Sequence, residues 1–295
     1  MWRRRSDGKL AREVPLTRRV MPYLMRGRNE SAVYYEQEIN LRKADAFIRA
    51  FNQANPATPI DPFHLTIYAL RDVMYRYPEM NRFVAGGRIY QRPEVWFSYA
   101  VKTKLQEGAP TVVVKRRYPP GESFEAMVAG MQAQLHEDRF GGTSHIEKEL
   151  GLLMFFPGFV RRILLACVRL GDRLGMLPRS FIEKDPMYAT TFFANFASIG
   201  MGAAYHHLYE YGTCGLFCAL GRPVNEPGSP TSGSDRRRTM NVRWTFDDRL
   251  GDGMVAALSL RRFKQVMEDP KAAGLSVATP AAAPPGGRVD GAALP

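Results

Sequence analysis

The stretch that decides the fold is TFDDRLGDG, residues 245–253, which lies close to the C-terminal end of a chain of 295 residues. Before it, residues 240–246 alternate apolar and polar side chains well enough for a strand. After it, residues 255–268 have the spacing of a helix that ends at Glu268-Asp269-Pro270. The stretch is therefore predicted to be a polar loop that joins a late strand to the last helix.

Three earlier segments complete a pattern with this loop. VPLTRRVM at 14–21 precedes a predicted strand, YPEMN at 77–81 follows a predicted helix, and FFANFASIG at 192–200 reads as a strand and a turn. In this order, the four segments resemble the catalytic domain of the dihydrolipoyl acyltransferases and the chloramphenicol acetyltransferase superfamily. The C-terminal signature of that family is F-D-H-R-x-x-D-G, and its last helix commonly ends in E-(D/N)-P.

The remaining pattern agrees with the fold that this resemblance implies, a two-layer αβ sandwich with a mixed sheet. Strands and helices intermix without strict βαβ order. Helices are predicted at 42–55, 62–77 and 122–138, and strands at 31–41, 95–104, 111–115, 190–195 and 216–220.

The resemblance also implies a homotrimer with active sites between subunits, where coenzyme A and the acyl acceptor enter a channel from opposite ends. The motif histidine acts there as a general base, and a serine or threonine stabilises the oxyanion. Arg249, Gly253 and Asn195 match structural positions of the motifs. Asp252 corresponds to an aspartate that pairs with an arginine and fixes the loop.

Two departures set this chain apart from the family pattern. Asp248 stands where the motif has histidine, and Ala194 stands where we place the oxyanion-stabilising residue. A carboxylate with an ordinary pKa of about 3.9 is a far weaker base than an imidazole of about 6.5. Loss of a general base costs about 10²–10⁴ in rate and loss of an oxyanion donor about 10²–10³, so we expect weak or absent standard activity.

A relocated base is one way to keep the chemistry. His206 and His207 follow the turn that contains Ser198, in a region that the resemblance places near the channel. Either imidazole is a candidate for proton transfer, with Ser198, Thr190 or Thr191 as oxyanion donor. The alternative is that the two histidines pack a turn, and we take His64, His136 and His145 as structural.

Charge and cysteine content limit the other functions. The formal net charge is +12, and residues 1–30 hold nine Arg and Lys against three acids. Aromatic residues do not interleave with these arginines, so we do not expect nucleic-acid binding. Cys167, Cys214 and Cys218 lie in apolar stretches without metal-ligand spacing, so we expect reduced core residues of a cytoplasmic protein and no metal.

The chain divides into a basic arm at 1–13, the acyltransferase-like domain at 14–270 and an Ala/Pro/Gly-rich tail at 271–295 that we expect to be disordered. A helical block at about 146–185 has no counterpart in the resemblance. Within it, residues 159–174 place their charges on one arc of about 120°. Only fourteen residues precede Pro15, so we expect a stand-alone member without its own lipoyl domain.

Three hypotheses for the function stay open. The chain is a coenzyme A-dependent acyltransferase with a rearranged site, a non-catalytic trimeric scaffold, or a protein that binds acyl chains or a membrane surface through the helical block. Assembly of trimers into a larger particle also stays open.

Overall fold

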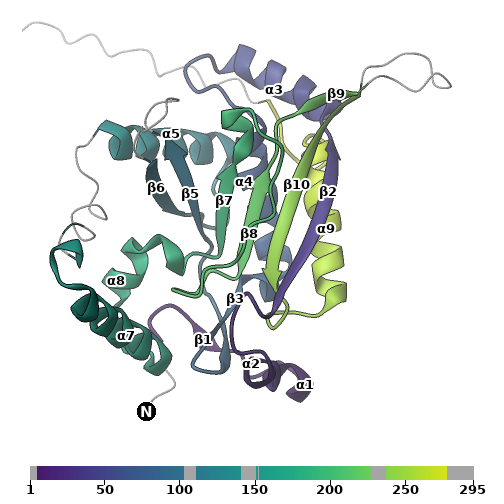
Figure 1. Cartoon of the computed structure of the whole chain (residues 1–295). Helices are drawn as coiled ribbons and strands as arrows, with labels where there is room; N and C mark the ends of the chain where they lie inside the picture. Colours follow the sequence, from purple (N-terminus) through teal and green to yellow (C-terminus); the bar gives the residue numbers. More distant parts are fainter. Residues whose placement is uncertain (1–4, 103–110, 141–150, 152, 227–236, 278–295) are drawn as a thin grey trace, which may run out of the picture.

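The computed structural model describes residues 5–102, 111–140, 151, 153–226 and 237–277, and it forms a mixed sheet covered by helices (Figure 1). Along the sheet the strand order is β2-β10-β8-β7-β5-β6, and β9 also pairs with β10. Strand β7 runs parallel to β5 and β8, whereas β10 is antiparallel to its neighbours. The strands are β2 (Ala32–Asn40), β5 (Trp96–Lys102), β6 (Thr111–Arg117), β7 (Thr191–Asn195), β8 (Leu216–Leu220), β9 (Val224–Glu226) and β10 (Arg237–Asp247).

Four helices pack their apolar side chains against one face of this sheet and form the main core. They are α3 (Arg42–Ala54), α4 (Pro62–Arg76), α5 (Phe124–Phe140) and α9 (Gly253–Glu268). Trp244 on β10 is fully buried and meets Phe263 on α9 edge to face, with ring centroids 4.8 Å apart. The helix and strand spacing in the sequence therefore predicted both layers of the αβ sandwich, and the fold class is confirmed.

The opposite face of the sheet is crossed by an extended segment, residues 200–215, that we call the crossing segment. Its backbone is fastened to β10: Arg243 Nη1 donates to the Ala203 carbonyl at 2.7 Å, and Thr245 Oγ1 donates to the His206 carbonyl at 2.6 Å. A second apolar cluster lies beneath it and includes Phe192, Leu208 and Phe217. The crossing segment thus closes a face that would otherwise expose its apolar side chains.

A small second sheet, of order β1-β4-β3, lies at one end of the domain. The strands β1 (Lys9–Leu10), β3 (Arg82–Ala85) and β4 (Arg88–Gln91) are too short for their alternation to be recognised in the sequence. Gly86 and Gly87 turn the chain between β3 and β4 with positive φ angles of 54° and 73°. Strand β1 lies within residues 1–13, so part of the predicted basic arm is a strand. Next to it lie α1 (Leu16–Arg19) and α2 (Met21–Leu24), and the 3₁₀ helix η1 (Pro78–Asn81) falls on the YPEMN step.

The helical block contains α7 (Gly158–Leu174) and α8 (Arg179–Lys184), followed by η2 (Pro186–Tyr188). Residues 146–150 and 152 of the predicted block lie outside the described residues. Helix α7 has no buried residue, and its Cys167 is exposed, so the expectation that all three cysteines belong to the core is wrong for Cys167. The reason is that Cys167 lies on the apolar arc of a helix whose arc is not covered by the domain.

The first residues of the predicted disordered tail are ordered. Residues 271–277 stay with the domain, since Leu275 is buried and Val277 packs against the main core. The rest of that tail, residues 278–295, lies outside the described residues, as do residues 1–4 of the basic arm. No helix among the described residues is long and apolar enough to cross a membrane.

Candidate functional site

The motif loop is held by a buried ion pair between Asp247 and Arg249. Arg249 Nε donates to Asp247 Oδ1 at 2.8 Å, and Nη2 donates to Oδ2 at 2.7 Å. The same guanidinium reaches the Met25 carbonyl at 2.9 Å, and Asp247 also accepts from Ser31 Oγ at 3.0 Å. This cluster fixes the end of β10 against the segment that leads into β2.

Asp252, which the family resemblance gave an arginine partner, lies directly before α9 and caps that helix. Its carboxylate accepts from the backbone N–H of Val255 at 2.9 Å and caps α9. Gly253 follows as the first residue of that helix. Within the described residues, the arginine of the motif loop, Arg249, pairs with Asp247.

Asp248 lies next to Arg18, which approaches from α1. Arg18 Nη1 donates to the Asp248 carbonyl at 2.8 Å and lies 3.7 Å from its Oδ1. Both side chains are partly exposed, at 24% for Arg18 and 36% for Asp248. Arg18 therefore occupies one side of the residue that stands at the motif position.

His206 and His207 lie in the crossing segment, on the face of the sheet away from the helices. The His206 ring stacks on Phe217 with centroids 3.9 Å apart and on His207 at 4.5 Å. Its Nδ1 lies 2.7 Å from the His207 carbonyl, which can only accept, so Nδ1 carries the proton and Nε2 is free to act as a base. Burial lowers the pKa of His206, which keeps the ring neutral near pH 7.

The topology separates the two halves of the predicted site within one chain. Asp248 directly follows β10, at the end where that strand pairs with the start of β8. Asn195 is the last residue of β7 and pairs with Leu220 on β8, which in turn pairs with Val242 on β10. Asp248 and the level of Asn195 are therefore six residues apart along β10. Six residues along a strand span roughly 20 Å. The predicted residues Asp248 and Ser198 therefore lie at opposite ends of the sheet and do not meet in one copy.

At the far end, Asn195 and Ser198 line a cavity of about 250 Å³ between α4, α5 and the carboxyl ends of β5 and β7. Ser198 Oγ donates to the Asn195 carbonyl at 2.7 Å and is exposed. The wall is mostly apolar, and the side chains that form it include Phe63, Tyr99, Val101, Met131 and Leu135. An apolar hollow with a few converging polar groups is the usual form of a ligand site.

The same cavity contains His64, which the sequence led us to take as structural. His64 Nδ1 lies 2.8 Å from Asp61 Oδ1, and the two residues form a capping box at the start of α4. The spacing Asp61-x-x-His64 is visible in the sequence, but it reads as a helix start. Only the fold brings it beside Asn195, which is distant in the chain.

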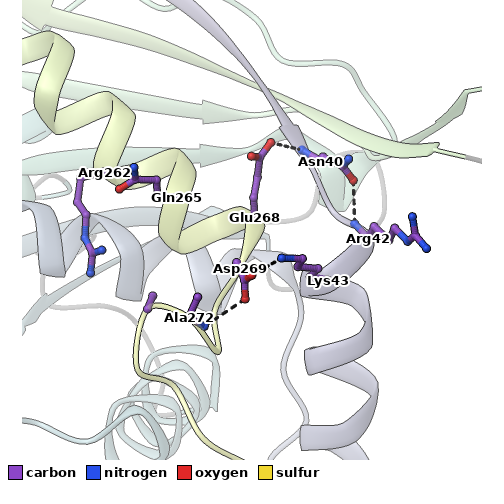
Figure 2. A pocket seen from close by; sticks show the side chains of 9 residues that line it. Asn40, Arg42, Lys43, Arg262, Gln265, Glu268, Asp269 and Ala272 are labelled. Atoms are coloured by element: carbon purple, nitrogen blue, oxygen red, sulfur yellow. Dashed lines mark hydrogen bonds and ion pairs between the residues drawn. The ribbon is translucent and has the colours of Figure 1, made fainter.

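Another cavity, of about 600 Å³, lies between the C-terminal end of α9 and the start of α3 (Figure 2). Most of its charged groups already have partners, inside or outside the cavity. Glu268 accepts from the Asn40 backbone N–H at 2.9 Å, and Lys43 contacts Asp269. The Glu268-Asp269-Pro270 end of the last helix thus holds α9 against the junction of β2 and α3. We interpret this cavity as a gap between packed elements and not as a catalytic site.

No group of three or more His, Cys, Asp or Glu side chains in the described part of the chain is arranged to hold a metal ion. Three places remain as candidate sites: Asp248 at one end of the sheet, the His206–His207 pair at its middle, and the cavity with His64 and Ser198 at the other end.

Comparison with known proteins identifies the fold. No family model and no curated protein matches the chain. A probable dihydrolipoamide acetyltransferase from Listeria monocytogenes superposes with a TM-score of 0.55 at 14% identity, covering 90% of this chain and 97% of that one. The cubic core of the pyruvate dehydrogenase multienzyme complex gives 0.54 at 16%, covering 90% and 94%. A chloramphenicol acetyltransferase gives 0.51 at 11%, covering 86% and 96%. The predicted resemblance to this superfamily is confirmed for the fold.

Proposed function

We propose that this protein transfers an acyl group from a coenzyme A thioester to a small acceptor, and that the cavity of about 250 Å³ holds the reacting end. The observation that carries the proposal is that one hollow brings together an imidazole, His64, and the motif residues Asn195 and Ser198. Ligand pockets commonly measure about 300–1,000 Å³. The volume here suits the thioester end and a short acyl group rather than a whole cofactor.

In the proposed reaction, His64 replaces the motif histidine as general base. Its imidazole takes the proton from the acceptor hydroxyl or thiol as that atom attacks the thioester carbonyl. Ser198 Oγ, which turns from the Asn195 carbonyl, donates to the resulting oxyanion. Collapse of the intermediate breaks the carbon–sulfur bond, and the protonated imidazole returns its proton to the coenzyme A thiolate.

We further propose a homotrimer, because the two ends of the motif site lie roughly 20 Å apart in one chain. A neighbouring copy brings its motif loop, with Asp248, to the cavity of the first. Fold relatives include the core of a multienzyme complex, which supports assembly through repeated copies of one chain. Sedimentation velocity of the full chain measures this directly.

The test of acyl transfer is release of free thiol from a series of acyl-CoAs with different chain lengths. His64→Gln is the decisive variant, since Gln at the third helical position keeps the capping box while removing the imidazole. It is expected to lower turnover about 10²-fold or more, and Ser198→Ala about as much. His136→Gln on the exposed side of α5 is the matched control and leaves turnover unchanged.

Three further variants separate the predicted bases. Loss of turnover in His206→Gln or His207→Ala, with His64→Gln active, would move the base to the crossing segment. Gain of turnover in Asp248→His alone would mean that the motif position still faces the substrate. No thiol release by any of these proteins would refute the proposal.

A second candidate is a non-catalytic member of this fold that serves as a scaffold. It is favoured by the pairing of Asp248 with Arg18, which occupies the motif position with an ion pair. A scaffold binds acyl-CoA weakly or not at all and keeps its assembly state in every site variant. Calorimetric titration of the full chain with acetyl-CoA distinguishes it from an enzyme.

A further inference from the structure

Helix α7 presents apolar side chains that the domain does not cover. None of its residues is buried, and Phe159, Ile163 and Leu170 are 66%, 57% and 56% exposed. These three residues lie within one narrow arc at 100° per residue. An isolated helix of this length is marginal in water, so an apolar face of this kind calls for a second surface to cover it.

Contacts among the described residues anchor the helix near its C-terminal end. Arg5 Nη2 pairs with Asp172 Oδ1 at 2.7 Å, and Ser6 Oγ donates to the Leu177 carbonyl at 3.2 Å. The Arg173 carbonyl lies against Gly86, where a side chain would not fit. These contacts fix the direction of α7 and leave its apolar arc free.

Positive charge borders the same arc. Helix α7 contains four arginines, and its single acid, Asp172, is already paired with Arg5. Arg162, Arg169 and Arg173 lie beside the apolar arc at 100° per residue, and Arg161 lies on the opposite side of the helix. Long basic side chains beside an apolar row are typical of helices that lie in a membrane interface.

A second, adjoining surface has the same character. The turn at Gly86 and Gly87 touches α7 through Gly86 and Tyr23 of α2 through Gly87. In Figure 1, α7, α2 and α1 lie towards the same end of the molecule. Leu16, Tyr23 and Leu24 are 78%, 64% and 65% exposed there.

Next to these side chains is a cavity of about 460 Å³ that no acidic residue lines. Its three arginines are Arg12, Arg19 and Arg88. Three guanidinium groups around one hollow suit a phosphate, and apolar side chains stand beside them.

We propose that α7, together with α1, α2 and this basic cavity, docks on an anionic phospholipid surface. The α7 apolar arc enters the headgroup boundary, the arginines contact lipid phosphates, and the cavity takes one headgroup. A second copy of the chain is a poorer occupant, because pairing α7 with itself sets arginines against arginines with no free acid on the helix to receive them.

The test uses co-sedimentation of the full chain with phosphatidylcholine vesicles, with and without phosphatidylglycerol. Cys167 gives an independent readout, since it lies exposed on α7 while Cys214 and Cys218 are buried. A polarity-sensitive fluorophore on Cys167 is expected to shift to shorter wavelength only with the anionic vesicles. Added inorganic phosphate is expected to leave the binding unchanged.

Two double variants of α7 address its apolar arc and the arginines beside that arc. Phe159→Ser/Ile163→Ser and Arg162→Glu/Arg169→Glu are each expected to weaken vesicle binding at least about tenfold. Because the four substituted side chains are exposed, both variants keep the melting temperature of the wild type. Val224→Ser on β9 and Arg261→Glu on α9, both exposed, are the controls and bind as the wild type does.

Three outcomes would overturn the proposal. Equal binding to neutral and anionic vesicles, or unchanged binding in both α7 variants, removes the lipid surface. Release of the protein from anionic vesicles by inorganic phosphate alone would show that the basic cavity binds a free anion and not a lipid headgroup. An oligomer that Phe159→Ser/Ile163→Ser dissociates, without any vesicle binding, assigns α7 to a second copy.

Discussion

Asp247 and Arg249, two residues apart in the motif loop, form an ion pair whose side chains are only 1% and 3% exposed. Their two parallel hydrogen bonds satisfy the carboxylate and fix the loop that contains Asp248. The pair therefore determines where the motif position points, although neither residue is a candidate for the chemistry.

Arg249→Met is expected to destabilise the protein by about 3–5 kcal/mol, because it leaves the Asp247 carboxylate buried without its partner. Denaturant unfolding measures the loss. Arg261→Met, at an exposed position of α9, is the control and should change stability by no more than about 0.5 kcal/mol. A loss below about 1 kcal/mol for Arg249→Met would mean that water reaches the carboxylate.

Gly212 is required in the crossing segment for two separate reasons. Its φ of 77° is unfavourable for other residues, and a Cβ there would collide with the Met187 carbonyl. Gly200 has a φ of 75°, but a Cβ there meets nothing within 4 Å. Gly200→Ala is thus expected to cost about 1 kcal/mol, and Gly212→Ala clearly more.

Thermal or denaturant unfolding of the two alanine variants, compared directly, isolates the collision from the backbone strain. Equal losses of stability would contradict the close approach at Met187.

The layers of the fold could be predicted because they rest on local patterns. The helices α3, α4 and α9 and the strands β2 and β8 lie where apolar spacing predicted them, within one or two residues at each end. The small sheet escaped notice because β1, β3 and β4 have two to four residues each and offer no measurable alternation. Likewise, residues 271–277 are too few for a helix or strand period to show that Leu275 and Val277 pack on the core.

The candidate site was less predictable, because it depends on long-range placement. Ser198 and Asn195 were singled out by their motif, but the His64 that shares their cavity is more than a hundred residues earlier in the chain. The resemblance implied an ion-pair role for Asp252, and the position of this residue directly before α9 also makes it a helix cap. The catalytic roles of Asp248, His206, His207 and Ser198 stay predictions.

Phe217 is expected to control the titration of His206. Burial against Phe217 and the crossing segment lowers the pKa of His206, so Phe217→Leu, which admits water to the ring, should raise that pKa towards about 6.5. NMR titration of the histidine ring protons measures the change. Phe155→Leu, at an exposed position near α7, is the matched control and should not move the His206 signal.

Lys115 gives the stability of the protein a defined pH dependence. Burial, with a smaller contribution from nearby Arg92, lowers the pKa of Lys115 to about 7, while its ammonium group donates to the carbonyls of Ile182 and Asp185. The unfolded chain keeps that proton up to about pH 10.4. Above pH 7 the unfolded state thus binds more protons than the folded state, and the free energy of unfolding rises with pH.

The free energy of unfolding is expected to rise by up to about 1.4 kcal/mol per pH unit between pH 7 and about 8.5. This range lies below the pH at which ordinary thiols ionise. Lys115→Met removes this rise, because the variant has no proton to lose at that position. Lys43→Met, whose side chain is 68% exposed, keeps it. Urea unfolding of the three proteins at half-unit steps of pH gives the free energy of unfolding as a function of pH. The same slope for wild type and Lys115→Met would contradict the prediction. It would mean that the buried ammonium stays charged, because its two carbonyl partners outweigh its loss of water.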